Sequence, residues 1–328
     1  MYPLNYLPFF LTVFFFTTDF CFVFTILKGP ETALLYCSAA SNDLIIFSSI
    51  LKLIGIYFEL SYIYFLALNP IDIFLTATSY IYLSRVRSIS FFSWRIDKSK
   101  VFSILKDSIP LIISAFAVTL YMKMDQIMIK SMIGNSDLGI FSVGIRFVEN
   151  LYFIPMLITS SFLPMLVEEK KKSEVEFQKS VYVLMSATLY VCITISLLLF
   201  FFSDLLIPLF FGEKFLKSID ILKIYSFTLI FTALGVSSSR WLLVENRQHL
   251  ALFRTISGLV LNLILNYIWI PKYGNIGASW SSLISNGFAS FLFYGLMPST
   301  FSIFKMQCYS FNPIPLITYY KKKSLGSK

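Results

Sequence analysis

The chain has 328 residues, of which 57% are hydrophobic and only 14% are charged. Soluble domains carry about 25% charged residues, so this composition excludes an ordinary water-soluble fold and indicates a membrane protein. The net charge of +9 does not indicate nucleic-acid binding, because the basic residues cluster in short segments between apolar runs and form no basic-aromatic module.

Long apolar runs predict the secondary structure. A helix needs about 20 apolar residues to cross a bilayer. Nine stretches meet this requirement: residues 4–27, 37–58, 61–84, 107–131, 138–166, 180–203, 218–239, 249–270 and 275–298. The second stretch is the least apolar, because Asn42, Asp43 and Lys52 interrupt it. We therefore expect an all-α fold, a polytopic bundle of about nine transmembrane helices.

The basic residues predict the orientation of these helices. If the basic segment 85–106 is cytoplasmic and the spans alternate, 19 Lys and Arg residues lie on the cytoplasmic side and only four on the other side. This asymmetry is typical of membrane topology. The tail 299–328, which ends in KKKSLGSK, is then cytoplasmic, where it can contact anionic lipid. The N-terminus MYPLNYLPFF lacks the basic region of a signal peptide, and its uncharged start predicts that further helices precede it.

Arg146 and Glu149 lie within the apolar stretch 138–166. An ionised group at bilayer depth costs at least about 2.5 kcal/mol, so such groups face a partner or a water-filled cavity. Ser142, Arg146 and Glu149 or Asn150 share one helix face by their spacing. Two interpretations follow. Either Arg146 binds a phosphate-bearing substrate through its planar guanidinium group, or Glu149 neutralises it and the pair holds two helices together.

Other spans also carry charged residues. Lys123 shares a face of span 107–131 with Gln126 and Lys130, whereas Asp125 points toward a neighbouring helix or the interface. Lys123 and Asp125 form a buried pair, or Lys123 extends to the outer surface. Lys223 lies about one turn inside span 218–239, where it extends to the surface or lines a cavity.

Polar residues form stripes on the last two spans. Asn262 and Asn266 lie on one face with Arg254, and Ser279, Ser282, Asn286 and Ser290 form a second stripe. Such stripes are more often helix–helix hydrogen bonds than ligand contacts. The candidate cavity residues are therefore Arg146, Lys123, Glu149, Arg254, Lys223, Asn262 and Asn266.

Catalytic signals are absent from the sequence. His249 is its single histidine, and HExxH, GxSxG and P-loop motifs do not occur. The four cysteines, Cys21, Cys37, Cys192 and Cys308, form no CxxC motif. We predict no enzymatic activity, no catalytic residue, no metal and no cofactor.

From about residue 101 onward, the sequence resembles the Wzx-type O-antigen and polysaccharide flippases of the multidrug/oligosaccharidyl-lipid/polysaccharide exporter superfamily. The matching segments are colinear: LKDSIPLIIS (105–114), LYMKMDQIMI (120–129), LGIFSVGIRFVENLYFIPM (138–156), FGEKF (211–215), LGVSSSRWLLVEN (234–246) and LNLILNYIWIPKYGNIGAS (261–279). The resemblance implies two six-helix bundles around a central cavity. Residues 107–298 would then be the second bundle, after a cytoplasmic loop at 85–106. Residues 1–84 would be the remainder of the first bundle, with about three spans and without its N-terminal helices.

The resemblance also implies a function. The substrate would be an oligosaccharide linked to undecaprenyl pyrophosphate, such as an O-antigen or capsule repeat unit. It would move from the cytoplasmic to the periplasmic leaflet of a bacterial inner membrane, with other polysaccharide-assembly membrane proteins as possible partners. Arg146 matches an arginine that is a candidate substrate contact in relatives, including lipid II flippases. Asp125 and Glu149 are the candidate carboxylates for coupling transport to an ion.

Two alternatives stay open. A drug or cation exporter of the same superfamily would need acidic cavity residues. The basic residues Lys52, Lys123, Arg146 and Lys223 argue against that function, whereas Asp43 and Asp125 are compatible with it. A membrane polysaccharide polymerase would need a long external loop, but the longest one predicted, at 203–217, has only about fifteen residues.

Overall fold

The computed structural model describes residues 50–74 with gaps, residue 116 and residues 118–312. The chain divides into two compact units, residues 1–106 and 107–328. The predicted span 4–27, the loop 85–106 and the end of the tail lie outside the described residues.

In the first unit, the described residues form parts of two helices. The described residues between 50 and 57 are helical, the chain turns at Phe58, and helical structure resumes at residue 63. This turn lies at the boundary expected between the spans 37–58 and 61–84. The Tyr64 hydroxyl donates a hydrogen bond of 3.0 Å to the Leu51 carbonyl and so joins the two helices. Lys52 is buried, with 3% of its surface exposed.

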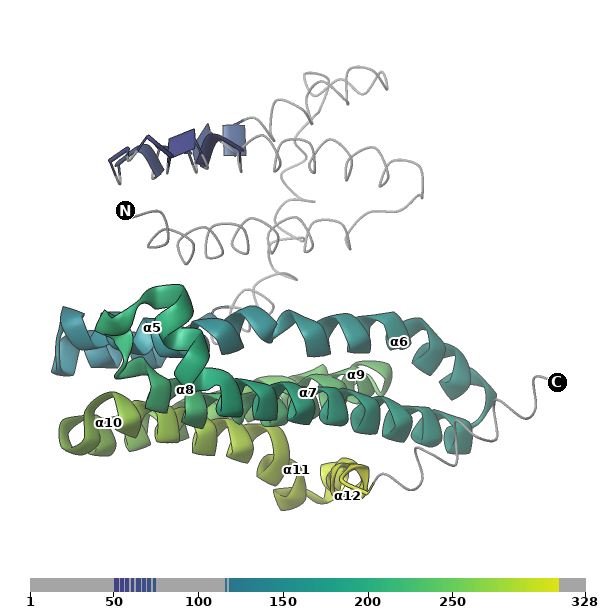
Figure 1. The fold of residues 1–328 in the computed structure, drawn as a ribbon. Coiled ribbons are helices and arrows are strands. Elements are labelled where there is room, and N and C mark those ends of the chain that lie inside the picture. The colour runs from purple at the N-terminus through teal and green to yellow at the C-terminus, as the bar shows by residue number, and fades with distance from the viewer. Residues whose placement is uncertain are drawn as a thin grey trace, which may run out of the picture. The chain divides into compact units, whose positions relative to one another are not determined.

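The first continuous helix that the structure describes in the second unit covers residues 118–132, and we call it the 118–132 helix. The helices that follow are α5 (Asn135–Leu151), α6 (Phe153–Lys172), α7 (Glu174–Phe211), α8 (Ser218–Ser226), α9 (Thr228–Val244), α10 (Gln248–Gly287), α11 (Phe293–Leu296) and α12 (Phe301–Ser310). Short helical turns lie at Glu213–Phe215, Phe288–Leu292 and Pro298–Thr300. Figure 1 shows the long helices α6, α7 and α9 packed side by side. The described residues contain no strand, which confirms the predicted all-α fold.

Among the described residues, four helical stretches are long and apolar enough to cross a membrane. They are Asn135–Lys172, Glu174–Phe211, Ser218–Val244 and Gln248–Leu296. The total number of spans in the chain stays a prediction.

Two predicted spans contain a local break, although each still forms one helical stretch long enough to cross a membrane. Span 138–166 divides into α5 and α6 at Tyr152, and span 218–239 divides into α8 and α9 at Phe227. Pro155 explains the first interruption, because proline has no N–H to donate and its ring clashes with the carbonyl four residues earlier.

At the second interruption, side-chain hydroxyls donate hydrogen bonds to backbone carbonyls, where they compete with backbone N–H groups. The Ser226 hydroxyl donates to the Lys223 carbonyl at 2.8 Å, and the Thr228 hydroxyl donates to the Tyr225 carbonyl at 2.6 Å. Ser196 of α7 donates to the Ser226 carbonyl at 2.7 Å. Hydroxyls that bond nearby carbonyls offer the chain an alternative to regular helical hydrogen bonds.

α10 is a hairpin of two helical arms, in agreement with the predicted spans 249–270 and 275–298. Gly274 has φ 58° and ψ −136°, a conformation outside the helical region that glycine adopts readily. The arms then run back along each other. The Asn262 amide of the first arm donates to the Ser285 hydroxyl of the second at 3.4 Å, and a Cβ added to Gly258 would lie 2.7 Å from the Ala289 Cβ.

The segment after the last predicted span is not simply a tail, because it contains α12. Figure 1 shows α12 nearly end-on, so it runs across the direction of the long helices. Its Gln307 is buried and donates hydrogen bonds of 2.8 Å to the Ser238 hydroxyl and the Ser290 carbonyl. The ten-residue α12 is too short to span a bilayer, so a search for spans did not reveal it.

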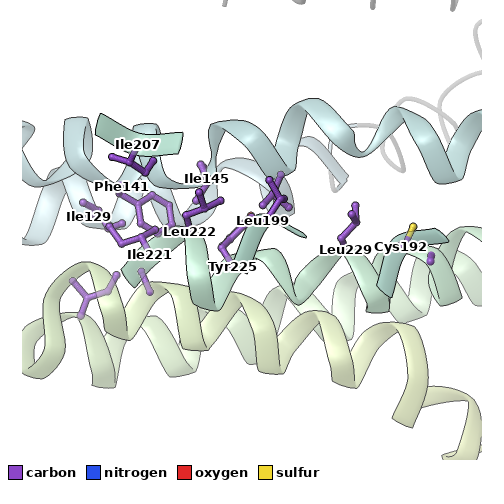
Figure 2. Close-up of a cluster of buried hydrophobic side chains, with 14 residues drawn as sticks. Ile129, Phe141, Ile145, Cys192, Leu199, Ile207, Ile221, Leu222, Tyr225 and Leu229 are labelled. Atoms are coloured by element: carbon purple, nitrogen blue, oxygen red, sulfur yellow. The ribbon is translucent and has the colours of Figure 1, made fainter. Parts of the chain in front are cut away.

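The second unit contains two separate hydrophobic cores. The first core lies between the 118–132 helix, α5, α7, α8, α9 and α10, and Figure 2 shows its side chains, including Phe141, Ile145 and Ile221. The second core joins α6, α7, α9, the start of α10, α11 and α12, and it includes Leu166 and Tyr294. Polar residues of α10 lie between the two cores and form part of the site described next.

Candidate functional site

α5 has a buried face and a charged face. Phe141, Gly144, Ile145 and Val148 are buried. Gly144 allows a close approach to α8, because an added Cβ would lie 2.5 Å from the Ile221 Cγ2 and 3.1 Å from the Ser218 carbonyl oxygen. The stripe of Ser142, Arg146 and Glu149 lies away from this packing and is partly exposed.

Lys123 forms an ion pair with Glu149. The Lys123 Nζ lies 3.0 Å from the Glu149 Oε1, and the two side chains are 46% and 14% exposed. The predicted pairing of Lys123 with Asp125 was therefore wrong, whereas the extension of Lys123 to the outer surface stays a prediction. Residues two apart on a helix lie about 200° apart around its axis, so Lys123 and Asp125 point in different directions.

Asp125 is 5% exposed and accepts hydrogen bonds from both arms of α10. The Asn262 and Asn266 amides donate to its Oδ1 at 2.9 Å and 2.6 Å, and the Ser282 hydroxyl donates to its Oδ2. The polar stripes therefore make helix–helix hydrogen bonds, as such stripes usually do, but the shared acceptor is a buried carboxyl group. The Asn266 Oδ1 is also buried and has no hydrogen-bond partner among the described residues.

Tyr152 links the two helix interruptions, a contact that the sequence analysis missed. Its hydroxyl lies 3.1 Å from the Thr228 hydroxyl oxygen, and the two residues adjoin the breaks between α5 and α6 and between α8 and α9. The sequence offered one sign of this contact. Tyr152 places a hydroxyl group inside an apolar run, close to Glu149 and Pro155.

The two remaining candidates, Arg254 and Lys223, contact other parts of the second unit. The Arg254 Nη1 donates to the Gly235 carbonyl at 3.0 Å, which places the guanidinium group against α9. Its Nε is buried and has no hydrogen-bond partner among the described residues. Lys223 pairs with Asp204 at 2.8 Å, between α8 and the end of α7. The structure therefore brings Lys123 to Glu149 and Asp125 to Asn262 and Asn266, but it joins neither Arg254 nor Lys223 to these groups.

Within the part of the chain that the structure describes, no group of three His, Cys, Asp or Glu side chains could hold a metal ion. The described side chains of the site offer ion pairs and hydrogen bonds. The site combines a charged face on α5 with a buried carboxyl group between two cores.

Residues 110–268 match the model of the MatE family. All of the predicted site residues, from Lys123 to Asn266, lie inside this matched region.

A curated relative and a solved structure are similar to the chain. The chain is 26% identical, over 215 residues, to the capsular polysaccharide biosynthesis protein CapF of Staphylococcus aureus. This alignment covers 65% of the chain and 54% of CapF. The fold is similar to that of the lipid II flippase MurJ in its inward closed conformation, with a TM-score of 0.60 and 17% identity. This likeness covers 95% of the chain and 65% of MurJ. The chain thus spans between half and two thirds of the length of the proteins it matches.

These similarities support the predicted resemblance to the multidrug/oligosaccharidyl-lipid/polysaccharide exporter superfamily. They agree with a multi-pass membrane protein of a transporter family rather than an enzyme family.

Proposed function

We propose that the chain moves an oligosaccharide linked to undecaprenyl pyrophosphate, such as an O-antigen or capsule repeat unit, from the cytoplasmic to the outer leaflet of a bacterial inner (plasma) membrane. The observation that carries this proposal is the charged face of α5, with Arg146 beside the Lys123–Glu149 ion pair, inside the region that matches the MatE family.

The chemistry of the cargo fits this face. A sugar head group cannot cross hydrocarbon unaided, and a diphosphate needs cations along its path. Arg146 offers a planar guanidinium group that binds phosphate oxygens in pairs. Without cargo, Glu149 neutralises Lys123. A diphosphate can replace the Glu149 carboxylate on Lys123, so binding of the cargo and release of Glu149 are linked.

Asp125 supports ion coupling. Its three neighbours on α10 are neutral donors, so no cation among them compensates an ionised carboxylate. Binding of a proton or small cation at Asp125 would change the charge between the two cores. In our proposal, Asp125 couples transport to an ion gradient and Glu149 responds to the cargo.

The test is Arg146→Ala in cells whose only flippase for the pathway is this protein. We expect loss of surface polysaccharide and accumulation of the lipid-linked precursor, with normal amounts of protein in the membrane. Lys130→Ala is a matched control, because Lys130 is an exposed lysine at the end of the 118–132 helix. Normal surface polysaccharide in the Arg146 variant would refute the role of Arg146.

Export of a cationic drug is the second candidate, and the buried Asp125 carboxyl group is the observation that favours it. Cells that express the protein would then resist cationic dyes while their surface polysaccharide depended on another protein. Unchanged dye resistance, together with restored polysaccharide, would exclude this candidate.

A further inference from the structure

Arg240 of α9 is a partly buried cation held only by hydroxyl groups. Its Nη2 donates to the Ser160 hydroxyl oxygen at 2.9 Å, and its Nε lies 3.4 Å from the Thr159 hydroxyl oxygen. The Thr159 hydroxyl already donates to the Pro155 carbonyl at 2.8 Å, so its oxygen is free to accept from Arg240. A guanidinium group has five N–H donors, and the two hydroxyl contacts use two of them.

The carboxylates at this end of α6 and α9 are bound to lysines instead. Lys170 bonds both Glu174 and Glu245, and Lys172 bonds Glu168 and Glu169. The hydrogen bond from Lys170 lowers the pKa of the Glu174 carboxyl group, which keeps that pair ionised at neutral pH. No carboxylate among the described residues contacts Arg240, so its charge has no counter-ion there.

Ser160 continues the charged stripe of Arg146. The two residues are 14 positions apart, close to four helical turns, so they lie on nearly the same side of α5 and α6. The backbone at Tyr152 keeps right-handed helical angles, which preserves this alignment through the interruption. At 1.5 Å per residue, the separation along the helix is about 21 Å. That distance is much longer than a diphosphate group, so one head group cannot contact both arginines at once.

We propose that Arg240, with Ser160 and Thr159, forms a second subsite for the diphosphate of the cargo, occupied at a different step from the Arg146 subsite. The inference rests on the proposed function and adds a second binding site for the cargo along the same transport path. Arg240 lies near the α9–α10 turn, which the predicted orientation places on the cytoplasmic side. The subsite therefore receives the cargo before Arg146 does.

The test measures binding of undecaprenyl diphosphate to the purified protein in nanodiscs, starting from the Arg146→Gln variant. This variant retains the Arg240 subsite, so we expect it to bind the probe. Adding Arg240→Gln should weaken binding by about tenfold or more, because it removes charge-assisted hydrogen bonds. Adding Arg247→Gln is the matched control. Arg247 lies at the same end of the bundle, bonds the Ser299 carbonyl at 2.9 Å and stacks on Trp241. We expect this control to bind like Arg146→Gln alone.

Three further probes identify the ligand. Undecaprenol lacks phosphate, inorganic pyrophosphate lacks the lipid, and phosphatidylglycerol is an ordinary anionic lipid. Undecaprenol should not compete, pyrophosphate should compete weakly, and phosphatidylglycerol should not displace the probe. Thermal unfolding of each variant checks that it is folded.

Two results would overturn the subsite: equal binding by the Arg146→Gln and Arg146→Gln/Arg240→Gln variants, or full displacement by phosphatidylglycerol. Neither result touches the proposed function, which depends on Arg146 and on transport in cells. If the wild-type protein does not bind undecaprenyl diphosphate, the proposed function itself fails and the subsite with it.

Discussion

Asp125 shows how a buried carboxyl group can be tolerated in an apolar bundle. Its two oxygens accept three hydrogen bonds from the two arms of α10, so one side chain holds three helical segments together. Removing an acceptor of this kind leaves buried donors unpaired, which costs about 1–3 kcal/mol.

Replacing Asp125 separates its structural role from its proposed role in coupling. In Asp125→Asn, the amide oxygen can still accept from Asn262 and Asn266, and the amide nitrogen can donate to the Ser282 hydroxyl oxygen. We expect this variant to melt close to the wild-type temperature but to lose transport driven by an ion gradient. Thermal unfolding in detergent and transport into vesicles with an imposed gradient measure the two properties.

Asp125→Ala is the companion variant. It removes the acceptor, so it should also lower the free energy of unfolding by about 2 kcal/mol. Gradient-dependent transport by Asp125→Asn at the wild-type rate would show that the carboxyl group has no part in coupling.

The sequence was informative about where these residues lie and uninformative about which of them meet. Helical spacing correctly put Asn262 and Asn266 on one face and turned Asp125 away from Lys123. It could not show that Asp125 and Asn262 are in contact, because 137 residues separate them and no local pattern records such a contact. The Lys123–Glu149 pair, 26 residues apart, was missed for the same reason.

At the scale of helices, the close packing of α5 on α8 supports the charged face of α5. Gly144→Ala would place a methyl group against Ile221 and the Ser218 carbonyl oxygen, and a backbone carbonyl moves only if the helix moves. We expect a loss of about 1–3 kcal/mol in the free energy of unfolding, together with reduced transport. Denaturation of the purified protein gives the first quantity.

Gly139→Ala in the same helix is the control. A Cβ at Gly139 meets nothing within 4 Å, so the change should leave stability equal or slightly higher. If both alanine variants unfold alike, the spacing of α5 and α8 is not limited by Gly144.

The Tyr152–Thr228 hydrogen bond joins the two helix interruptions. Tyr152→Phe and Thr228→Val each remove one partner, and the double variant removes both. A direct hydrogen bond predicts a coupling energy of about 1 kcal/mol in the double-mutant cycle, measured by unfolding. Strictly additive effects would mean that the two hydroxyls do not act on each other.

Hydropathy predicts these two spans but not the breaks inside them. Hydropathy measures only the apolar length, so α5 with α6, and α8 with α9, each read as one span. Pro155 was a visible cause for the first break. The second break depends on Ser196 of α7, which lies 30 residues before the carbonyl it bonds.

At the scale of the whole molecule, the arrangement of the second unit follows from its sequence pattern. Apolar segments fill the two cores, and the polar stripes of α10 fall between them. The same pattern predicts how the unit sits in the membrane, because lysine and arginine are strongly biased to one set of loops. The charges in the short loops predict the orientation. The α6–α7 turn and the α7–α8 connection lie at opposite ends of the long helix α7.

These two connections give the sharpest test of orientation. Lys171, in the last turn of α6, and Lys214, in the short turn Glu213–Phe215, are exposed residues that flank α7. Each can be changed to Cys in a protein whose own cysteines are replaced by Ser. In whole cells, a membrane-impermeant maleimide should label the Lys214→Cys variant. It should label the Lys171→Cys variant only after the membrane is permeabilised. Both variants remove one lysine, so they disturb the charge equally. The opposite labelling pattern would invert the topology and would place the Arg240 subsite on the exit side of the path, because Arg240 and Lys171 lie at the same end of the bundle.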